Sequence, residues 1–238
     1  MSAFCVRRSE FGANDHVGWN PFHIPKYGIC YKCCNINVIC YIIPYSGIWN
    51  DMPLHPQDIV VLLKLVANRD GSKRWTYAEL GKDLLMSASQ VFRSVDRAEA
   101  ARLLSAPSIA TAPKLAEELP LTWMFPNSNN LKEFLIHGVK YSFPVERGGP
   151  TRGTPTAEAA PPLNQMLVQD FPLPPVWPNP AGLFRGIAFS PLHKTVPQVA
   201  MRDPKLYELL ALVDAIREGR AREREIAIRE LTARIDSR

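Results

Sequence analysis

Two helix-start signals stand eleven residues apart between residues 76 and 104, and they constrain the fold more than any other feature of the chain. Thr76 is followed three positions later by Glu79, and Ser87 is followed three positions later by Gln90. Each pair has the pattern of a capping box, in which a hydroxyl and a carboxylate or amide side chain satisfy backbone N–H groups at a helix start. The spacing predicts one short helix, a tight turn and a second helix.

The apolar residues of this stretch agree with two packed helices. Leu80 and Leu84 share a face of the first helix. Gly81 is expected where the two helices approach each other, and Met86 is expected to fill the core beside the turn. The inward stripe of the second helix is formed by Val91, Val95 and Ala98.

The outer face of the second helix is rich in side chains that can reach base edges or phosphates. These residues are Ser87, Ser89, Gln90, Arg93, Ser94 and Arg97. A small residue near the bend, followed by a helix with a polar first turn, resembles the helix-turn-helix of bacterial winged-helix transcriptional regulators. The resemblance covers roughly residues 54 to 155. It implies a mainly α fold with a small β-wing and a recognition helix over 87–104 in the major groove of double-stranded DNA.

Two further segments carry cations suited to a DNA interface. Lys73 and Arg74 precede the first helix of the pair and are able to meet phosphate. Residues 140–154 contain the Gly- and Arg-rich sequence PVERGGPTRG and are predicted to form the wing. Arg147 and Arg152 would then contact phosphate or the minor groove.

Helical patterns stand on both sides of these segments. Residues 56–68 begin with a proline at the first helical position. Their predicted buried stripe is Ile59, Leu62, Leu63 and Val66. A helix around Leu131 is expected to end at Gly138, before an alternating segment over 139–143 that predicts a strand. Two amphipathic helices separated by Gly219 are predicted within residues 204–238.

Prolines dominate the part of the chain that precedes these last helices. Residues 144–204 contain 13 of the 22 prolines, which excludes a regular helix or a central strand. Large apolar residues such as Phe171, Trp177 and Phe189 interrupt the prolines. Residues 156–203 are therefore predicted to form an extended arm that packs on the same domain, on a second subunit or on a different protein.

Residues 1–51 differ in composition from the rest and hold all five cysteines. Cys30 and Cys33 have a zinc-site spacing but lack a second well-spaced ligand pair, so we expect no metal and no cofactor. We also expect that Met52 is the native start and that the preceding residues are a doubtful extension.

The charge of the chain and its motifs limit the functions that the sequence supports. The net charge of +5 and the pI near 9.0 suit an anionic partner without requiring one. No apolar run is long enough for a membrane span and no signal peptide is recognised, so a cytoplasmic protein is expected. The five histidines are scattered and no catalytic motif is found, which argues against an enzyme.

The sequence thus predicts a winged helix-turn-helix domain over 52–155, a proline-rich arm over 156–203 and C-terminal helices over 204–238. The predicted function is sequence-specific DNA binding as a homodimer, with the arm or the C-terminal helices binding a partner protein. The alternative is a winged-helix interaction module, such as a toxin-binding antitoxin, that does not bind DNA. Its basis is that the arginines of the second helix are partly offset by Asp96 and Glu99.

Overall fold

The computed structural model describes residues 54–69, 75–105, 125–168 and 172–237, all within one unit that spans Pro53–Arg238. Its longer helices are α1 (Pro56–Ala67), α2 (Tyr77–Leu84), α3 (Ala88–Ala100), α9 (Pro204–Glu218) and α10 (Ala221–Asp236). The shorter helical elements are α5 (Ser128–Glu133), η4 (Phe134–Gly138), α6 (Val139–Ser142), η5 (Ala157–Ala159), α7 (Leu163–Met166) and α8 (Val196–Ala200). The strands are β1 (Leu104–Ser105), β2 (Phe125–Pro126), β3 (Arg147–Pro155), β4 (Pro175–Pro178) and β5 (Phe184–Phe189). The coarse prediction of a helix-rich fold with a small sheet is confirmed.

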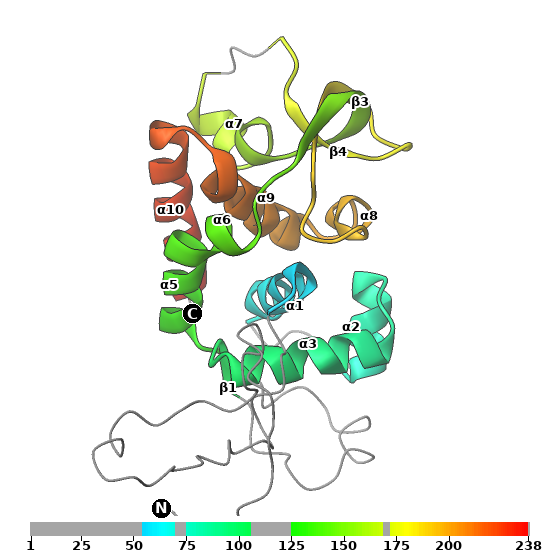
Figure 1. The fold of residues 1–238 in the computed structure, drawn as a ribbon, viewed down its shortest axis with the longest axis vertical. Helices are drawn as coiled ribbons and strands as arrows, with labels where there is room; N and C mark the ends of the chain where they lie inside the picture. The colour runs from blue at the N-terminus through cyan, green and yellow to red at the C-terminus, as the bar shows by residue number, and fades with distance from the viewer. Residues whose placement is uncertain (1–53, 70–74, 106–124, 169–171, 238) are drawn as a thin grey trace, which may run out of the picture. The chain divides into compact units, whose positions relative to one another are not determined.

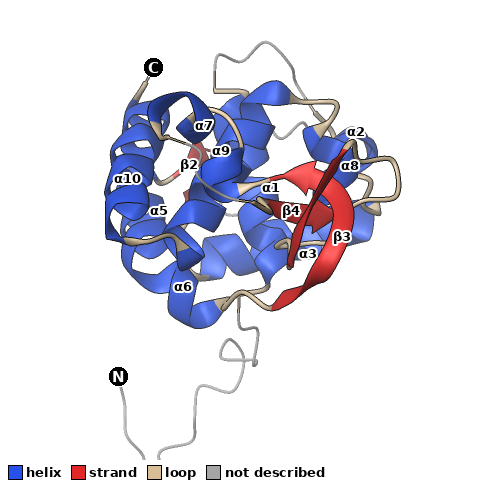
Figure 2. Ribbon diagram, turned by 90° about the horizontal axis from the view of Figure 1, so that it is seen from above, coloured by secondary structure: helices blue, strands red, loops and turns tan. Residues whose placement is uncertain are grey.

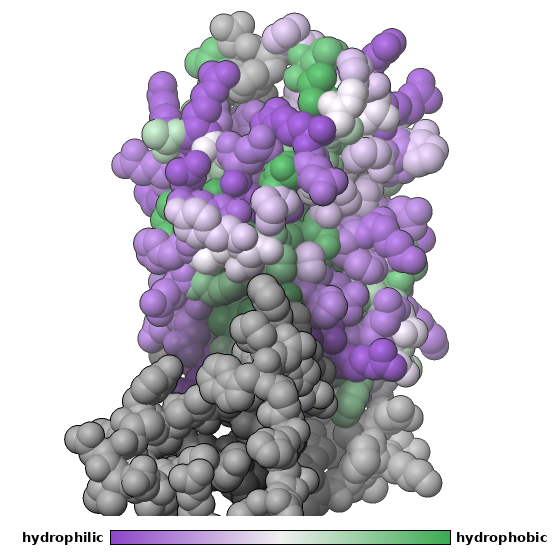
Figure 3. Space-filling view, in the orientation of Figure 1, coloured by the Kyte–Doolittle hydropathy of each residue, from purple (hydrophilic) through white to green (hydrophobic). Residues whose placement is uncertain are grey.

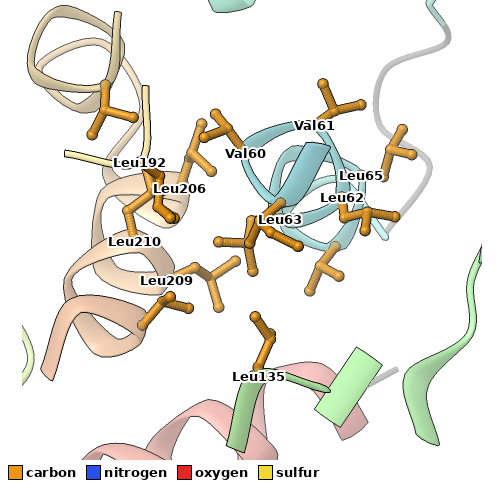
Figure 4. Packing of buried hydrophobic residues seen from close by; sticks show 14 of the residues in the cluster. Val60, Val61, Leu62, Leu63, Leu65, Leu135, Leu192, Leu206, Leu209 and Leu210 are labelled. Atoms are coloured by element: carbon orange, nitrogen blue, oxygen red, sulfur yellow. The ribbon is translucent and has the colours of Figure 1, made fainter. Parts of the chain in front are cut away.

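Helix α1 lies at the centre of the unit, between α3 and α9 (Figure 1). The predicted stripe is buried, and so are three apolar residues outside it. The buried apolar residues of α1 are Ile59, Val60, Val61, Leu62, Leu63, Leu65 and Val66. Figure 4 shows Leu206, Leu209 and Leu210 of α9 on one side of this helix. A helix with buried apolar residues on all sides is stable only inside a protein. The helices on either side of α1, which include α3 and α9, therefore pack on it as a common core.

A continuous helical segment runs from α5 through η4 to α6. The predictions that the helix ends at Gly138 and that residues 139–143 form a strand are wrong. A Cβ on Gly138 would lie 3.0 Å from the ring of Phe134, so the glycine makes room for that ring within the helix. Phe134 packs edge-on against Phe143, with the ring centroids 6.2 Å apart. Packing of this kind outweighs the weak strand signal of a short alternating segment.

Strands β3, β4 and β5 form a small closed sheet in which each strand pairs with the other two. Figure 2 shows β3 and β4 together at one side of a molecule made mostly of helices. The predicted wing over 140–154 is therefore wrong, because its second half is β3 and pairs with residues 176–178 and 184–189. The domain boundary expected after residue 155 would separate β3 from β4 and β5, although these three strands pair in one sheet.

The proline-rich segment is thus an integral part of the unit rather than a separate arm. Its large aromatic residues Trp177 and Phe189 are buried, which selects the first of the three surfaces considered for it, the chain's own domain. Prolines are tolerated because Pro175 and Pro178 lie at the two ends of the short strand β4. The face of the molecule in view in Figure 3 is largely hydrophilic, which agrees with burial of the large apolar residues inside the unit.

The two C-terminal helices occur where the sequence predicts them. Asp203 caps α9 by accepting a hydrogen bond from the backbone N–H of Leu206 at 3.1 Å, and Gly219 separates α9 from α10. Helix α10 buries Ala227, Leu231 and Ile235 against the unit itself. The apolar stripe of α10 is therefore covered by other residues of the same chain. Within the described ranges no helix combines the length and the apolar character needed to cross a membrane.

Candidate nucleic-acid interface

Both predicted capping boxes are formed. Glu79 Oε2 accepts from the backbone N–H of Thr76 at 2.8 Å, and Thr76 Oγ1 accepts from that of Glu79 at 3.3 Å. Gln90 Oε1 and Ser87 Oγ make the corresponding bonds at 2.9 and 3.2 Å. These bonds set the starts of α2 and α3, so the prediction of two consecutive helices is confirmed.

The turn between the helices consists of residues 85–87. Leu85 adopts the left-handed conformation with φ of 55°, and the N–H of Met86 binds the carbonyl of Gly81 at 2.8 Å. Met86 is buried, as predicted. A Cβ on Gly81 would lie only 2.6 Å from the carbonyl oxygen of Met86, which confirms the close approach expected there.

Gly81→Ala is expected to destabilise the protein by about 1–3 kcal/mol, because the added methyl group would force the turn away from α2. Urea unfolding followed by circular dichroism measures this change. Ala78→Gly is the matched control on the exposed side of α2, where the only cost is about 1 kcal/mol of helix propensity. A stability of Gly81→Ala equal to that of the wild type would contradict the tight turn.

The first two turns of α3 present a polar outer face. Ser87, Ser89 and Arg93 are exposed and Gln90 is half-buried. Arg93 has no hydrogen bond or ion pair among the described residues, so its guanidinium is free for a ligand. Ser87 Oγ and Gln90 Oε1 serve the capping box, which leaves the amide nitrogen of Gln90 as its available donor.

The prediction that Ser94 and Arg97 belong to this exposed face is wrong. Both are buried, and Arg97 turns toward α1. Its Nε and Nη2 donate to Oδ2 and Oδ1 of Asp58 at 2.7 and 2.6 Å. Ser94 Oγ accepts from Arg97 at 3.3 Å and from Gln57 at 3.3 Å. The hydrogen bond to Asp58 raises the pKa of Arg97 above its usual value.

The far half of α3 has a mixed electrostatic environment. Burial, with a smaller effect of Asp96, raises the pKa of Glu99. Burial also raises the pKa of Tyr77 to about 12, with smaller contributions from Glu99 and Asp96. Because Arg97 is neutralised by Asp58, the outward charges of α3 and its C-terminal turn are Arg93 and Arg102 against Asp96 and the half-buried Glu99. The surface is therefore nearly neutral.

The two predicted DNA contacts that lie on β3, Arg147 and Arg152, are not part of α3. Arg147 lies on β3, where its Nε donates to Glu218 Oε1 at 2.7 Å and its guanidinium stands 5.9 Å from the ring centroid of Phe189. Arg152 is exposed further along β3. Lys73 and Arg74 lie outside the described residues, as do the cysteines and the proposed start at Met52, so these predictions stay predictions.

Two partners in these arrangements were missed by the sequence analysis. Asp58 has the position of an ordinary acidic residue in a first helical turn, and the only signal for its burial is the apolar run that follows it in α1. Arg185 is the cross-strand partner of Arg152, and no local signal indicates a pairing between residues so far apart.

A cavity of about 250 Å³ lies among the ends of α1, α9 and α10, away from α3. Its arginines are engaged: Arg69 donates to the carbonyl of Ile235 and to Ser128 Oγ, and Arg234 donates to Glu208 at 2.9 Å. No cluster of His, Cys, Asp and Glu suited to a metal ion occurs in the described part of the chain.

Comparisons with protein families, curated proteins and solved structures found no match to the chain.

Proposed function

We propose that the protein is a sequence-specific DNA-binding regulator of the winged helix-turn-helix type, acting in the cytoplasm. The observation that carries the proposal is the α2–turn–α3 unit, whose second helix exposes Ser89, Gln90 and Arg93 at its N-terminal half. In helix-turn-helix proteins the N-terminal residues of the second helix contact base edges in the major groove. Arg93 is suited to a bidentate contact with guanine, and Gln90 can donate to a base or a phosphate.

The pair β1–β2 supports the same proposal. Leu104 pairs with Pro126 and Ser105 with Phe125, directly after α3. Two antiparallel strands in this position are the base of a wing in a winged helix. The residues that connect β1 to β2 lie outside the described ranges, so the proposal depends on the strand pair alone. Two-fold symmetric dimers on palindromic sites are the corresponding mode of binding.

Arg93→Ala is expected to weaken binding to the selected DNA sequence by about 1–3 kcal/mol, or roughly fivefold to 150-fold. If the lost contact is to phosphate, the salt dependence of binding also falls by about one counterion. Fluorescence anisotropy with labelled duplex at several salt concentrations measures both quantities. Arg229→Ala is the matched control, because it removes an exposed arginine from α10.

The DNA sequence for this assay comes from selection of genomic fragments with the purified full-length chain. Enrichment of a palindromic sequence supports the proposal. Absence of any enriched sequence, or unchanged affinity of Arg93→Ala for an enriched one, would contradict the placement of α3 in the major groove. The unfolding curve of Arg93→Ala is expected to match the wild type, since this side chain is exposed.

A second function is favoured by the balance of charge on α3. With Arg97 buried against Asp58, the helix offers little net attraction to phosphate, whereas non-specific DNA affinity depends on such attraction. The same fold would then serve as a protein-interaction module, such as a toxin-binding antitoxin. The selection experiment separates the two functions, because only the first predicts an enriched sequence.

A further inference from the structure

Two arginines stand directly opposite each other in the sheet. Arg152 of β3 pairs with Arg185 of β5 in antiparallel register, so both side chains project from the same face. Like charges in this position destabilise a sheet. Both residues are exposed, and within the described residues neither guanidinium has a hydrogen bond or an ion pair. The pair is therefore a cost to folding that the described part of the unit does not offset.

The chain segments that form the sheet and α8 contain more basic than acidic residues. Across 147–168 and 172–202 the described residues include five lysines and arginines but one acidic residue, Glu158. The basic residues are Arg147, Arg152, Arg185, Lys194 and Arg202. Arg147 is paired with Glu218. The described residues of 147–202 thus carry a net positive charge, whereas the outer face of α3 is nearly neutral.

Large apolar side chains lie beside the two arginines. Leu183 is 93% exposed and stands two positions before Arg185, just ahead of β5. The loop that carries Leu183 is held against β3, because the backbone N–H of Asn179 binds the carbonyl of Arg152 at 3.1 Å. The Nδ2 of Asn179 also lies 3.5 Å from the sulfur of Met201, which is 61% exposed. We call Arg152, Leu183, Arg185 and Met201 the sheet-end patch.

We propose that the sheet-end patch binds a partner protein through an acidic segment that also carries apolar side chains. Carboxylates of the partner would pair with Arg152 and Arg185, and its apolar residues would cover Leu183 and Met201. Arginine, aromatic residues and methionine are the residue types enriched in protein interfaces. Charge complementarity supplies the specificity, because a basic partner is repelled by the unpaired arginines.

Other occupants fit the patch less well. Each strand of the sheet pairs with both others, so the patch offers its side chains rather than a strand edge for pairing. Phosphates of a duplex would match the arginines but would leave Leu183 and Met201 without apolar contacts. A second copy of the chain is a poor acidic partner, because the chain carries a net charge of +5.

The position of the patch allows it to act together with α3. The sheet lies at the opposite end of the described unit from α3, with α1 and α9 between them (Figure 1). A partner at the sheet would leave the outer face of α3 free. The inference therefore does not depend on whether α3 binds DNA, and the partner could control the regulator without displacing it.

The test begins with the full-length chain carrying Leu183→p-benzoylphenylalanine, expressed in its native host and irradiated. The expected adduct joins residue 183 to a protein segment in which Asp or Glu flanks apolar residues. The identified partner is then purified, and its affinity for the wild type is compared with that for Arg152→Glu. A decrease of about tenfold to 100-fold is expected. Changing the cross-linked acidic residues of the partner to lysine is expected to restore binding to Arg152→Glu.

Arg152→Glu also has a readout that separates binding from folding. It places a glutamate opposite Arg185, so the midpoint of urea unfolding is expected to rise while partner affinity falls. Arg229→Glu on α10 is the matched charge reversal and is expected to leave the affinity unchanged. An adduct to a second copy of the chain, an adduct to nucleic acid, no adduct, or an affinity insensitive to Arg152→Glu would each overturn the proposal.

Discussion

Asp58→Ala is expected to lower the free energy of unfolding by about 3–5 kcal/mol, the usual cost of removing one partner of a buried ion pair. The carboxylate of Asp58 accepts two hydrogen bonds from the Arg97 guanidinium, and its Oδ2 also accepts from the backbone N–H of His55 at 2.8 Å. Without it, the guanidinium stays buried between α1 and α3 with no counter-charge. A domain of marginal stability, about 5–15 kcal/mol in total, would lose a large fraction of it.

Urea unfolding of three variants checks this expectation. Arg97→Ala should lose a similar amount, since it leaves the Asp58 carboxylate buried and unpaired. The double variant Asp58→Leu/Arg97→Met should recover most of the loss, because apolar residues of similar size often replace a buried pair without cost. Asp236→Ala removes the more exposed pair with Lys132 and should cost about 0–1 kcal/mol. Comparable losses in all of these variants would contradict the special role of the buried pair.

The same variants separate the two roles considered for Arg97. A residue that contacts DNA from the surface changes affinity and leaves stability intact, as expected for Arg93→Ala. A residue that joins α1 to α3 changes stability, and affinity falls only to the extent that the protein unfolds. An Arg97→Ala variant with wild-type unfolding and reduced DNA affinity would show that the guanidinium is available to DNA after all.

Local signals in the sequence were sufficient for α2, α3 and the turn. A capping box joins two residues three positions apart. Its two backbone N–H groups and two side-chain oxygens are therefore brought together by the same turn of helix that they stabilise. The glycine at position 81 and the methionine at position 86 follow from the same local geometry. These features needed no knowledge of the remaining chain.

Errors arose where contacts between distant segments decide the structure. Helix α3 packs against both α1 and α2, so its buried sector is wider than its apolar stripe and includes Ser94 and Arg97. Strand β3 finds its partners more than 20 residues further along, which no local pattern encodes. The prolines predict an extended arm, but the short strand β4 accommodates Pro175 and Pro178 at its two ends.

Asp214→Ala is expected to cost about 3–5 kcal/mol, because Asp214 is the buried junction between α9 and the sheet. Its Oδ2 accepts from Thr156 Oγ1 at 2.8 Å and from Trp177 Nε1 at 2.7 Å. Its Oδ1 accepts from Arg217 Nη1 at 2.7 Å. Arg217 in turn donates from Nε to the carbonyl of Phe143 at 2.9 Å, just before β3. Removal of the carboxylate leaves a cation, an indole N–H and a hydroxyl buried without their acceptor.

The measurement is urea unfolding followed by circular dichroism, because this signal does not depend on Trp177 and serves every variant. Trp177→Phe keeps an aromatic ring but removes one donor, so it should cost about 1–3 kcal/mol, less than Asp214→Ala. Asp214→Ala/Arg217→Leu should recover part of the loss, because the double variant no longer buries an unpaired cation. If α9 merely lay against the sheet by apolar contact, Asp214→Ala would cost no more than an exposed substitution, and the sheet would not need this helix to hold β3 in place.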